Sequence, residues 1–570
     1  MLHKQIQQSL QSVVASLLPD ADLASVQVRP ATDPKFGDYQ CNALMALAKE
    51  RKRNPRQLAE EVLKLLNLSD VCEKVEIAGA SFLNFRIAPA AMAQALSAAH
   101  RGEHLFIQPV ASPETYVVDF SAPNVAKPMH VGHIRSTGIG DTITRTLRLL
   151  GHKVITDNHI GDWGTQFGQL LIGWKKYLDR EALAKAPLEE MGRLYKKVHA
   201  EFEASEEVRN EARQELVKLQ NGDSENLQYW REMIRLSLQE FERIYARLGV
   251  TFDHALGESF YNPQLKSVVE ELKAKGIARE SEGAIVVFFD QPDLKETPMI
   301  VQKSDGASNY ATTDLATLAY RIETWAPDEI VYVTDGRQQL HFRQLFATFQ
   351  KWKPQTARLS HVWFGAILGP DNKPYKTRSG ETVKLADLLD EAEERAFVIV
   401  SEKNPELSEI ERREVARVVG ISAIKYADLL PNRQSDYVFN WDKMLAFTGN
   451  TAPYLQYAYT RLRSIARKAE SEKIASEPKF DLTEPEELAL AKRLLNFGIV
   501  IEAAAEEYRP NYLCNYLYDL AGLLSRFYEQ CPVLKADGQT RIDRLALCDL
   551  AARVLQQGLT VLGIETTERM

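Results

Sequence analysis

A short apolar strand, a turn-rich loop, a helix and a second strand follow one another between residues 116 and 157. The first run is "YVVDFS", rich in β-branched and aromatic residues, and the last is "KVITDNH". Between them, "HVGHIRSTGIGDTITRTLRLL" has apolar residues at helical spacing, and Gly151 suits a helix stop. Strand, loop, helix and strand in this order are the beginning of a parallel sheet, so we expect a doubly wound α/β fold.

Long charged helical patterns interrupt this alternation over residues 175–250, for example "EFEASEEVRNEARQELVKL", and indicate an inserted helical subdomain. From about Ser422 onwards strand patterns nearly vanish and long helical patterns run to the end of the chain. We therefore expect a Rossmann-like catalytic core in residues 113–421 and an all-helical domain in residues 422–570. Between the insertion and the helical domain, the alternation of strands and helices resumes. It consists of the strand-like runs "GAIVVFF" and "PMIVQK", a helix from Tyr310 to Thr324, the strand "EIVYVT", a helix from Gln338 to Trp352, and the strand-like "HVWFGAI".

Residues 1–112 are expected to form a separate α+β domain. They combine helical periodicity with "KFGDYQ", a helix at "CNALMALAKE" and the strand-like "SFLNFRIAP". The stretch "RGEHLFIQPVASPET", with Pro109 and Pro113, is typical of a linker. Three domains agree with the length of 570 residues, which predicts about three to five.

The composition, with 45% hydrophobic and 26% charged residues, is ordinary for a soluble globular protein. No apolar run approaches the roughly 20 residues that span a bilayer, and the N-terminus does not resemble a signal peptide. We therefore expect a cytoplasmic protein with no membrane partner. The net charge of −8 argues mildly against a nucleic-acid partner, so RNA would have to meet local patches such as "KERKRNPRQ" or "RLRSIARK". Either patch can also be a solvated helix face.

The five cysteines form no C-x-x-C pair and have irregular spacings. They are expected to be buried small hydrophobic residues in a reducing compartment. This argues against a cysteine zinc site, and no structural metal is predicted. They are Cys41, Cys72, Cys514, Cys531 and Cys548.

The loop after the first strand carries a concentration of phosphate-binding chemistry. His130 and His133 lie three apart, on one face of the first turn of a helix expected to begin near Met129–His130. Gly132 leaves room for close approach, and Lys127 adds a fixed positive charge. A helix N-terminus beyond the carboxyl end of a parallel strand suits a polyphosphate.

Two other interpretations of the histidine pair stay open on these residues alone. The pair can belong to a metal site, although no third or fourth ligand lies nearby in sequence, or it can serve as a helix cap. The chain has no G-x-x-x-x-G-K-[ST] motif and no complete G-x-G-x-x-G after this strand, which weakens P-loop and dinucleotide-binding interpretations.

"PMHVGHIRST" resembles the H-x-G-H signature of class I aminoacyl-tRNA synthetases. Five wider blocks resemble the bacterial arginyl-tRNA synthetase family and occur in the expected order between residues 116 and 570. They are "VDFSAPNVAKPMHVGHIRSTGIGD", "NHIGDWGTQFG", "YATTDLA", "FNWDKMLAFTGNTAPYLQYAYTR" and "LGIETTERM".

The resemblance implies an enzyme that activates L-arginine with ATP, delivered with Mg2+, and transfers it to tRNA(Arg). In the family both signature histidines face the ATP phosphates, which assigns these roles to His130 and His133, and Gly132 lets the adenine pack closely. The second class signature, K-M-S-K-S, is not intact in "KPYKTRSGETVKL". The resemblance implies that Lys127 substitutes for the missing lysine, with Lys376 and Arg378 contributing to ATP binding.

Arginine recognition is implied by the same resemblance and has a physical basis, because carboxylates match the planar donors of a guanidinium. Asp119 ends the first strand, and Tyr310 and Asp314 are four apart on one helix face. These three are expected to hold the guanidinium, and His341 to face the same crevice. Asn124 and Gln338 are expected to hold the α-amino and carboxylate end of the amino acid.

The family uses the helical domain for the tRNA anticodon and the N-terminal domain, which "KFGDYQCN" resembles, for the tRNA elbow. Tyrosines and arginines interleave in "NTAPYLQYAYTRLRSIARK", which suits base stacking and phosphate contacts, although about half of these tyrosines can be core residues. The expected tRNA-binding residues are Tyr454, Gln456, Tyr457, Tyr459 and Arg461. A monomer is expected.

Three rival functions remain. A nucleotidyltransferase of the same superfamily shares the signature and the sheet but does not need the large helical domain. A synthetase-like protein without catalysis is disfavoured because His130, Gly132, His133, Lys127 and Asp119 are intact. A cysteinyl enzyme would carry zinc-ligand cysteines.

Overall fold

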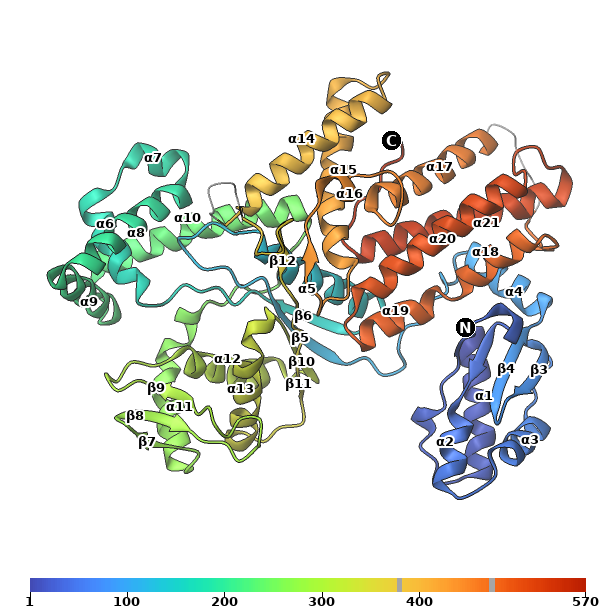
Figure 1. Cartoon of the computed structure of the whole chain (residues 1–570), viewed down its shortest axis with the longest axis horizontal. Helices are drawn as coiled ribbons and strands as arrows, with labels where there is room; N and C mark the ends of the chain where they lie inside the picture. The colour runs from blue at the N-terminus through green and yellow to red at the C-terminus, as the bar shows by residue number, and fades with distance from the viewer. Residues whose placement is uncertain (377–381, 471–476) are drawn as a thin grey trace.

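The computed structural model describes residues 1–376, 382–470 and 477–570. A four-stranded parallel sheet of order β11-β10-β5-β6 lies near its centre (Figure 1). Helices alternate with these strands, which confirms the predicted doubly wound core. The strands are β5 (Thr115–Phe120), β6 (Lys153–Asp157), β10 (Glu329–Val333) and β11 (Arg358–His361), and the helices are α5 (Gly132–Leu149), α12 (Tyr310–Trp325) and α13 (Gln339–Trp352).

The direction of strand addition reverses at β5. The chain leaves β5 through α5 to reach β6 on one side, whereas β10 pairs with the other side of β5. In open α/β sheets, ligands bind outside the carboxyl ends of the strands at such a switch point. The loops that follow β5 and β10 therefore border the candidate site.

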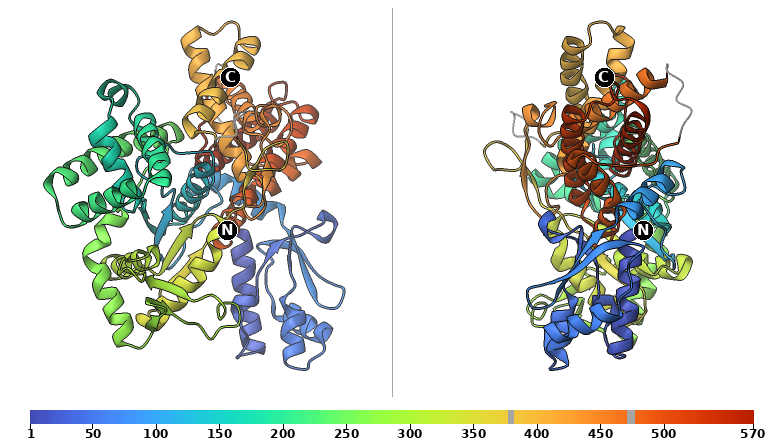
Figure 2. Two further views of the ribbon diagram at one scale, coloured as in Figure 1. Left: turned by 60° about the vertical axis from the view of Figure 1, so that its left-hand side comes forward. Right: turned by 90° about the vertical axis from the view of Figure 1, so that its right-hand side faces the viewer.

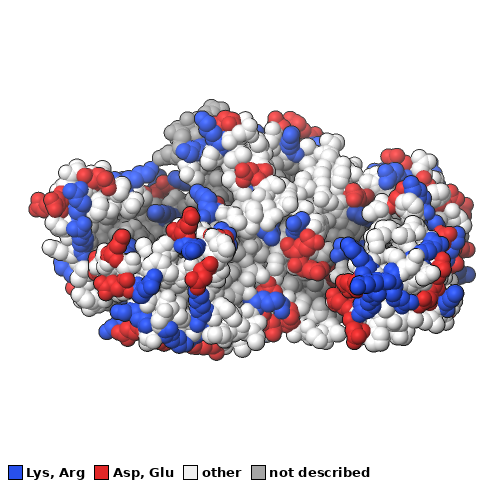
Figure 3. Space-filling view, turned by 60° about the horizontal axis from the view of Figure 1, so that its bottom comes forward, with Lys and Arg blue, Asp and Glu red and all other residues white. Residues whose placement is uncertain are grey.

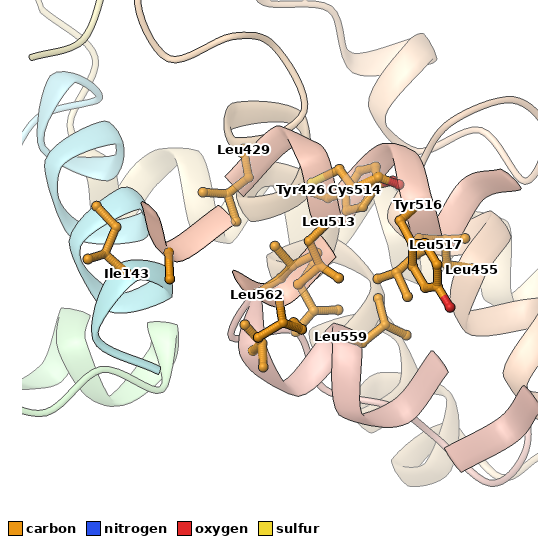
Figure 4. Close-up of a cluster of buried hydrophobic side chains, with 14 of the residues drawn as sticks. Ile143, Tyr426, Leu429, Leu455, Leu513, Cys514, Tyr516, Leu517, Leu559 and Leu562 are labelled. Atoms are coloured by element: carbon orange, nitrogen blue, oxygen red, sulfur yellow. The ribbon is translucent and has the colours of Figure 1, made fainter. Parts of the chain in front are cut away.

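Helix α5 is buried between the sheet and the C-terminal helices. It approaches β5 so closely that a Cβ added at Gly140 would lie 2.2 Å from the Phe120 ring. On another side, Ile143 of α5 and Leu429, the last residue of α15 (Glu409–Leu429), lie among the apolar side chains that join the core to the helical domain (Figure 4). This packing fixes α5, whose first turn carries His133.

One part of the predicted alternation is wrong. The runs "GAIVVFF" and "PMIVQK" form β8 (Ala284–Val287) and β9 (Met299–Gln302), which pair antiparallel in a separate sheet with β7 (Ala278–Ser281). The segment between β8 and β9 contains no helix, and a parallel pair needs a long, usually helical crossover. The run "HVWFGAI" also divides, because β11 ends at His361 and β12 (Ile367–Leu368) pairs instead with β13 (Tyr437–Val438).

The predicted insertion is a group of helices beside the core (Figure 1). It consists of α6 (Gln166–Tyr177), α7 (Arg180–Lys185), α8 (Pro187–Ala204), α9 (Glu206–Gln220) and α10 (Ser224–Leu248). Helix α11 (Asn262–Ala274) follows and packs against α12.

The N-terminal domain is α+β, as predicted. Its antiparallel sheet has the order β1-β2-β4-β3, and it lies beside the C-terminal helices in both Figures 1 and 2. An ion pair of 2.7 Å between Lys492 and Asp38 joins the two. The elements are α1 (Leu2–Leu17), β1 (Arg29–Pro30), β2 (Tyr39–Cys41), α2 (Ala43–Glu50), α3 (Pro55–Leu65), β3 (Cys72–Ala78), β4 (Phe82–Ile87) and α4 (Pro89–His100).

Over its described residues, the C-terminal part is helical apart from the short strand β13. All five cysteines of the chain are buried and free, as predicted. None of the helices in the described ranges is both long and apolar enough to cross a membrane. The helices are α14 (Leu385–Lys403), α15 (Glu409–Leu429), α16 (Trp441–Met444), α17 (Ala452–Glu470), α18 (Pro485–Leu495), α19 (Phe497–Glu506), α20 (Pro510–Gln530) and α21 (Gly538–Val561).

Candidate active site

The loop after β5 has a strained backbone. Ser121, Ala122 and Ala126 have positive φ angles of 75°, 48° and 62°, a region that non-glycine residues rarely adopt. Side chains from other elements hold the loop: Asn158 accepts from the Ala122 N–H (3.0 Å), and Ser237 of α10 accepts from the Ala126 N–H (3.0 Å). Such strain, of order 1–3 kcal/mol per residue, persists only where the surroundings fix it, and it clusters at functional sites.

Asn124 lies exposed in this loop, and Gly161 lies next to it. The two residues form a parallel bridge, and a Cβ added at Gly161 would lie 2.2 Å from Oδ1 of Asn124. The loop after β6 therefore needs a glycine at this position to accommodate the Asn124 side chain in its present orientation.

The two signature histidines face each other, with ring centroids 4.0 Å apart. The His130 backbone N–H donates to Nδ1 of His133 (2.9 Å), and the Gly132 N–H donates to Nδ1 of His130 (3.1 Å). Nδ1 of His133 also lies 3.3 Å from His130 O, but the shorter N–H contacts favour acceptance at both Nδ1 atoms, which places the proton of each neutral ring on Nε2. The pair therefore has two Nε2–H donors that these backbone contacts leave available.

Both imidazoles are held in the neutral form. Burial, and to a smaller extent the neighbouring His130 ring, lower the pKa of His133 to about 3. Partial burial and then the Arg337 guanidinium lower the pKa of His130. At neutral pH the free protein therefore offers phosphate oxygens N–H donors rather than imidazolium charges.

The structure shows a steric requirement for a glycine at position 132 that the sequence alone does not reveal. A Cβ at Gly132 would lie 2.9 Å from Cε1 of His130. The space beside Gly132 is thus filled by the His130 ring.

Lys127 is exposed, and its ammonium lies 5.6 Å from the ring centroid of Tyr195, on helix α8 of the insertion. The signature also pairs with the chain beyond the degenerate lysine loop: the Val131 N–H donates to Val383 O (2.9 Å), and the Leu385 N–H donates to Met129 O (2.9 Å). Lys376 is exposed and forms a bridge with Thr382, whereas Arg378 lies outside the described residues.

A second group of polar side chains lies at the start of α12 and α13. Nε2 of His341 lies 2.6 Å from Oδ2 of Asp314, and the His341 ring packs edge-on against Tyr310 at 4.9 Å. The structure thus brings Tyr310, Asp314 and His341 together. Gln338 is exposed just before α13, in the loop that follows β10.

Asp119 is in a different environment, because its carboxylate is buried and already paired. Nη2 of Arg321 donates to Asp119 (2.8 Å) and to Asp157 (2.8 Å). Burial opposes the charge on Arg321, but the two carboxylates outweigh burial and raise the pKa of the guanidinium. Asp119, near the carboxyl end of the inner strand β5, therefore neutralises a buried arginine.

Sequence reasoning overlooked Glu258, in "LGESFYN". Burial, then Asp314 and Asp162, raise the pKa of its carboxyl to about 8. Asp162 is fixed by hydrogen bonds from Ser259 N–H (2.8 Å) and Oγ (2.6 Å). The available signal was an acidic residue in a glycine- and serine-containing turn between the insertion and the next helix.

The residues expected to bind tRNA divide into two groups. Tyr457 and Arg461 are exposed on α17, and Tyr454 is half-buried beside Tyr518, with ring centroids 5.7 Å apart. Gln456 and Tyr459 are instead fully and nearly fully buried. They hold the C-terminal tail: Gln456 donates to Glu565 O (2.8 Å), and the Tyr459 hydroxyl donates to Glu568 (3.2 Å). The side chains of Gln456 and Tyr459 are therefore not accessible to RNA in this structure.

Two observations bear on other partners. Among the residues that the structure describes, no group of three or more His, Cys, Asp and Glu side chains could hold a metal ion.

On the face shown in Figure 3, basic and acidic side chains intermingle, and several basic side chains gather toward the N-terminal domain. A net negative charge is therefore compatible with local basic surface.

Three family models match the chain. The tRNA synthetases class I (R) catalytic domain matches residues 97–441. The arginyl tRNA synthetase N terminal domain matches residues 1–87, and the DALR anticodon binding domain matches residues 455–570. The catalytic match includes the signature histidines and the residues of α12 and α13.

Curated relatives and solved structures agree with these matches. The arginine–tRNA ligase of Chromobacterium violaceum is 46% identical to this chain, and the match covers 100% of both chains. That of Escherichia coli K12 is 50% identical over 95% of this chain and 96% of the relative. The arginyl-tRNA synthetase structure from Thermus thermophilus matches with a TM-score of 0.87 and 27% identity over 100% of both chains. That from Plasmodium falciparum matches with a TM-score of 0.83 and 29% identity over 100% of this chain and 99% of the other.

Proposed function

The chain belongs to the arginyl-tRNA synthetase family, and from this premise we propose how its residues divide the work of charging tRNA with arginine. As a class I aminoacyl-tRNA synthetase it uses ATP and joins arginine to tRNA through an arginyl-adenylate. The arginine carboxylate attacks the α-phosphate of ATP and pyrophosphate leaves. The 3′-terminal ribose hydroxyl of tRNA then attacks the adenylate and AMP leaves.

The Nε2–H donors of His130 and His133 and the ammonium of Lys127 stabilise the negative charge that develops on the phosphates. Little covalent help is needed in such a displacement, so positioned donors and cations supply most of the catalysis. ATP arrives with Mg2+ as part of the substrate, and Lys376 and Arg378 assist from the lysine loop. Support comes from the facing imidazoles and from the signature backbone, which pairs with residues 383–385.

The guanidinium of arginine is held by Asp314 and Tyr310. Glu258 supplies a second carboxylate, and Asp119, near the carboxyl end of β5, supplies a third. Asn124 and Gln338 hold the α-amino and carboxylate end, since they lie on the adjacent loops after β5 and β10. A guanidinium prefers carboxylate partners in a partly buried site. The observation that carries the proposal is that the acidic side chains and the two signature histidines belong to segments around the same switch point of the sheet, at the carboxyl ends of β5 and β10.

The rest of the chain contacts tRNA. Residues 1–112 meet the tRNA elbow, and residues 422–570 meet the anticodon, with Tyr454, Tyr457 and Arg461 on the contact surface. The protein acts as a monomer in the cytoplasm. The aromatic and basic side chains exposed on α17 support this role, because they suit stacking and phosphate contact.

Pyrophosphate exchange against all twenty amino acids, with and without tRNA, tests this function. The expected result is exchange with arginine alone, and only when tRNA is present. Exchange with another amino acid would overturn the specificity, and exchange without tRNA would overturn the proposed dependence on tRNA.

A further inference from the structure

Helix α8 of the insertion touches the signature region at two points. Near its middle, the Tyr195 ring lies under the ammonium of Lys127, 5.6 Å from ring centroid to Nζ. In its first turn, Glu189 forms an ion pair with Lys384, whose backbone bridges to His130. One helix thus contacts both Lys127, which precedes the signature, and Lys384, whose backbone pairs with it.

The Tyr195 ring is itself held in place. It stacks on His199, one turn later, with centroids 5.5 Å apart and planes 11° apart. Nδ1 of His199 lies 3.2 Å from Oε1 of the nearly buried Gln169 on α6. Leu194, beside Tyr195, is fully buried, and a Cβ at Gly173 of α6 would lie 3.0 Å from its Cβ. The packing around Tyr195 therefore restricts the position of its ring.

Lys127, in contrast, forms no ion pair with a carboxylate in the described part of the chain, and it is exposed on a loop. A lysine side chain has a flexible four-carbon stem, so its ammonium occupies many positions unless a neighbour restricts it. An aromatic face restricts a cation without neutralising it, whereas a carboxylate would compete with the phosphates for its charge. An aromatic neighbour is the suitable partner for a lysine that must meet an anion.

We propose that Tyr195 is a positioning residue that directs the Lys127 ammonium toward the ATP phosphates, so that the insertion forms one wall of the ATP site. This inference rests on the role proposed above for Lys127. It adds that the α8 surface around Tyr195 is part of the activation machinery, although it lies about 60 residues along the chain from the signature.

The test compares Tyr195→Leu, Tyr195→Phe and Lys127→Ala, alone and combined, in arginine-dependent pyrophosphate exchange with the full-length protein and tRNA. Tyr195→Leu is expected to lower kcat by about twofold to fivefold, since a cation–π contact at an exposed site is weak. The KM for arginine stays unchanged, and Tyr195→Phe, which keeps the ring, stays near wild type. In the Lys127→Ala background Tyr195→Leu causes no further loss.

Tyr177→Leu is a matched control, because Tyr177 of α6 lies 3.6 Å from the Lys197 ammonium in the same insertion. It is expected to leave exchange unchanged. Thermal melting of every variant reports folding. An equal loss from Tyr195→Leu with and without Lys127 would show a general structural effect and overturn the inference.

Two further outcomes separate the inference from the proposed function. If Lys127→Ala abolishes exchange while Tyr195→Leu behaves as wild type, the lysine has its proposed role but Tyr195 does not position it. If Lys127→Ala itself retains wild-type exchange, the role of the lysine fails and the inference fails with it.

Discussion

Nη2 of Arg321 donates a hydrogen bond of 2.8 Å to Oδ2 of Asp119, and both side chains are buried. The same guanidinium is shared with Asp157. A buried charge of this kind needs its partners, because removing one leaves part of the charge unpaired. Asp119 therefore contributes to the stability of the sheet independently of any ligand.

Asp119→Asn is expected to lower the free energy of unfolding by about 1–3 kcal/mol, the range for a lost hydrogen bond between charged groups, since Asp157 still holds Arg321. Urea unfolding measures the loss. Asp314→Asn, at a partly exposed position, is the control and should change stability little. Unchanged stability of Asp119→Asn would contradict the structural role of this carboxylate.

Asp314→Ala should act on arginine rather than on ATP. Removing a charge-assisted partner of the guanidinium is expected to raise the KM for arginine by about tenfold to a hundredfold, while the KM for ATP changes less than twofold. Steady-state aminoacylation separates the two constants. Glu323→Ala, on the outer face of the same helix, should alter neither, and equal rises in both constants for Asp314→Ala would argue against a guanidinium contact.

Arginine binding should release a proton. The Glu258 carboxyl is mainly neutral at pH 7, because burial, Asp314 and Asp162 raise its pKa to about 8. A bound guanidinium favours the ionised form and lowers this pKa, so the affinity for arginine rises as the pH increases from about 6 to 8 and then levels off. The KM for arginine between pH 6 and 8.5 measures this dependence.

Glu258→Gln is the control for this titration, since His159 and His341 also lie near Asp314. The amide cannot ionise, so the variant should bind arginine weakly and without the rise toward pH 8. The same slope in the variant and in the wild-type protein would assign the titration to another group.

His133 should work through a neutral donor. Its Nδ1 accepts from the His130 backbone, and burial lowers the pKa of the ring to about 3, which leaves Nε2–H for the phosphates. A glutamine amide can occupy the Nε2 position, whereas alanine offers no donor. Pyrophosphate exchange should therefore fall by about 10²–10³-fold in His133→Ala and much less in His133→Gln. Equal losses in both variants would contradict a donor role.

The order of the elements and the position of the signature were predictable because period and turn chemistry are local properties. The pairing of β8 with β9, and the burial of Gln456 beside the C-terminal tail, depend on contacts between distant segments and left no local pattern. Glu258 was missed for the same reason, since its significance comes from Asp314, which lies 56 positions later in the chain. Asp119 was predicted to be a site residue, but its partner Arg321 could not be predicted from the strand alone.

Tyr457 and Gln456, adjacent on α17, should respond oppositely to substitution by alanine. Tyr457 is 47% exposed and Gln456 is fully buried. Loss of a stacking ring is expected to raise the KM for tRNA by about tenfold without changing the melting temperature. Gln456→Ala removes hydrogen bonds to Ser422 Oγ (2.9 Å) and Glu565 O (2.8 Å), so it should lower the melting temperature by several degrees and leave the KM for tRNA unchanged wherever the protein is folded. Melting curves and tRNA titrations of the two variants, prepared side by side, distinguish surface from core, and a weakened tRNA interaction in Gln456→Ala at full stability would reverse this assignment.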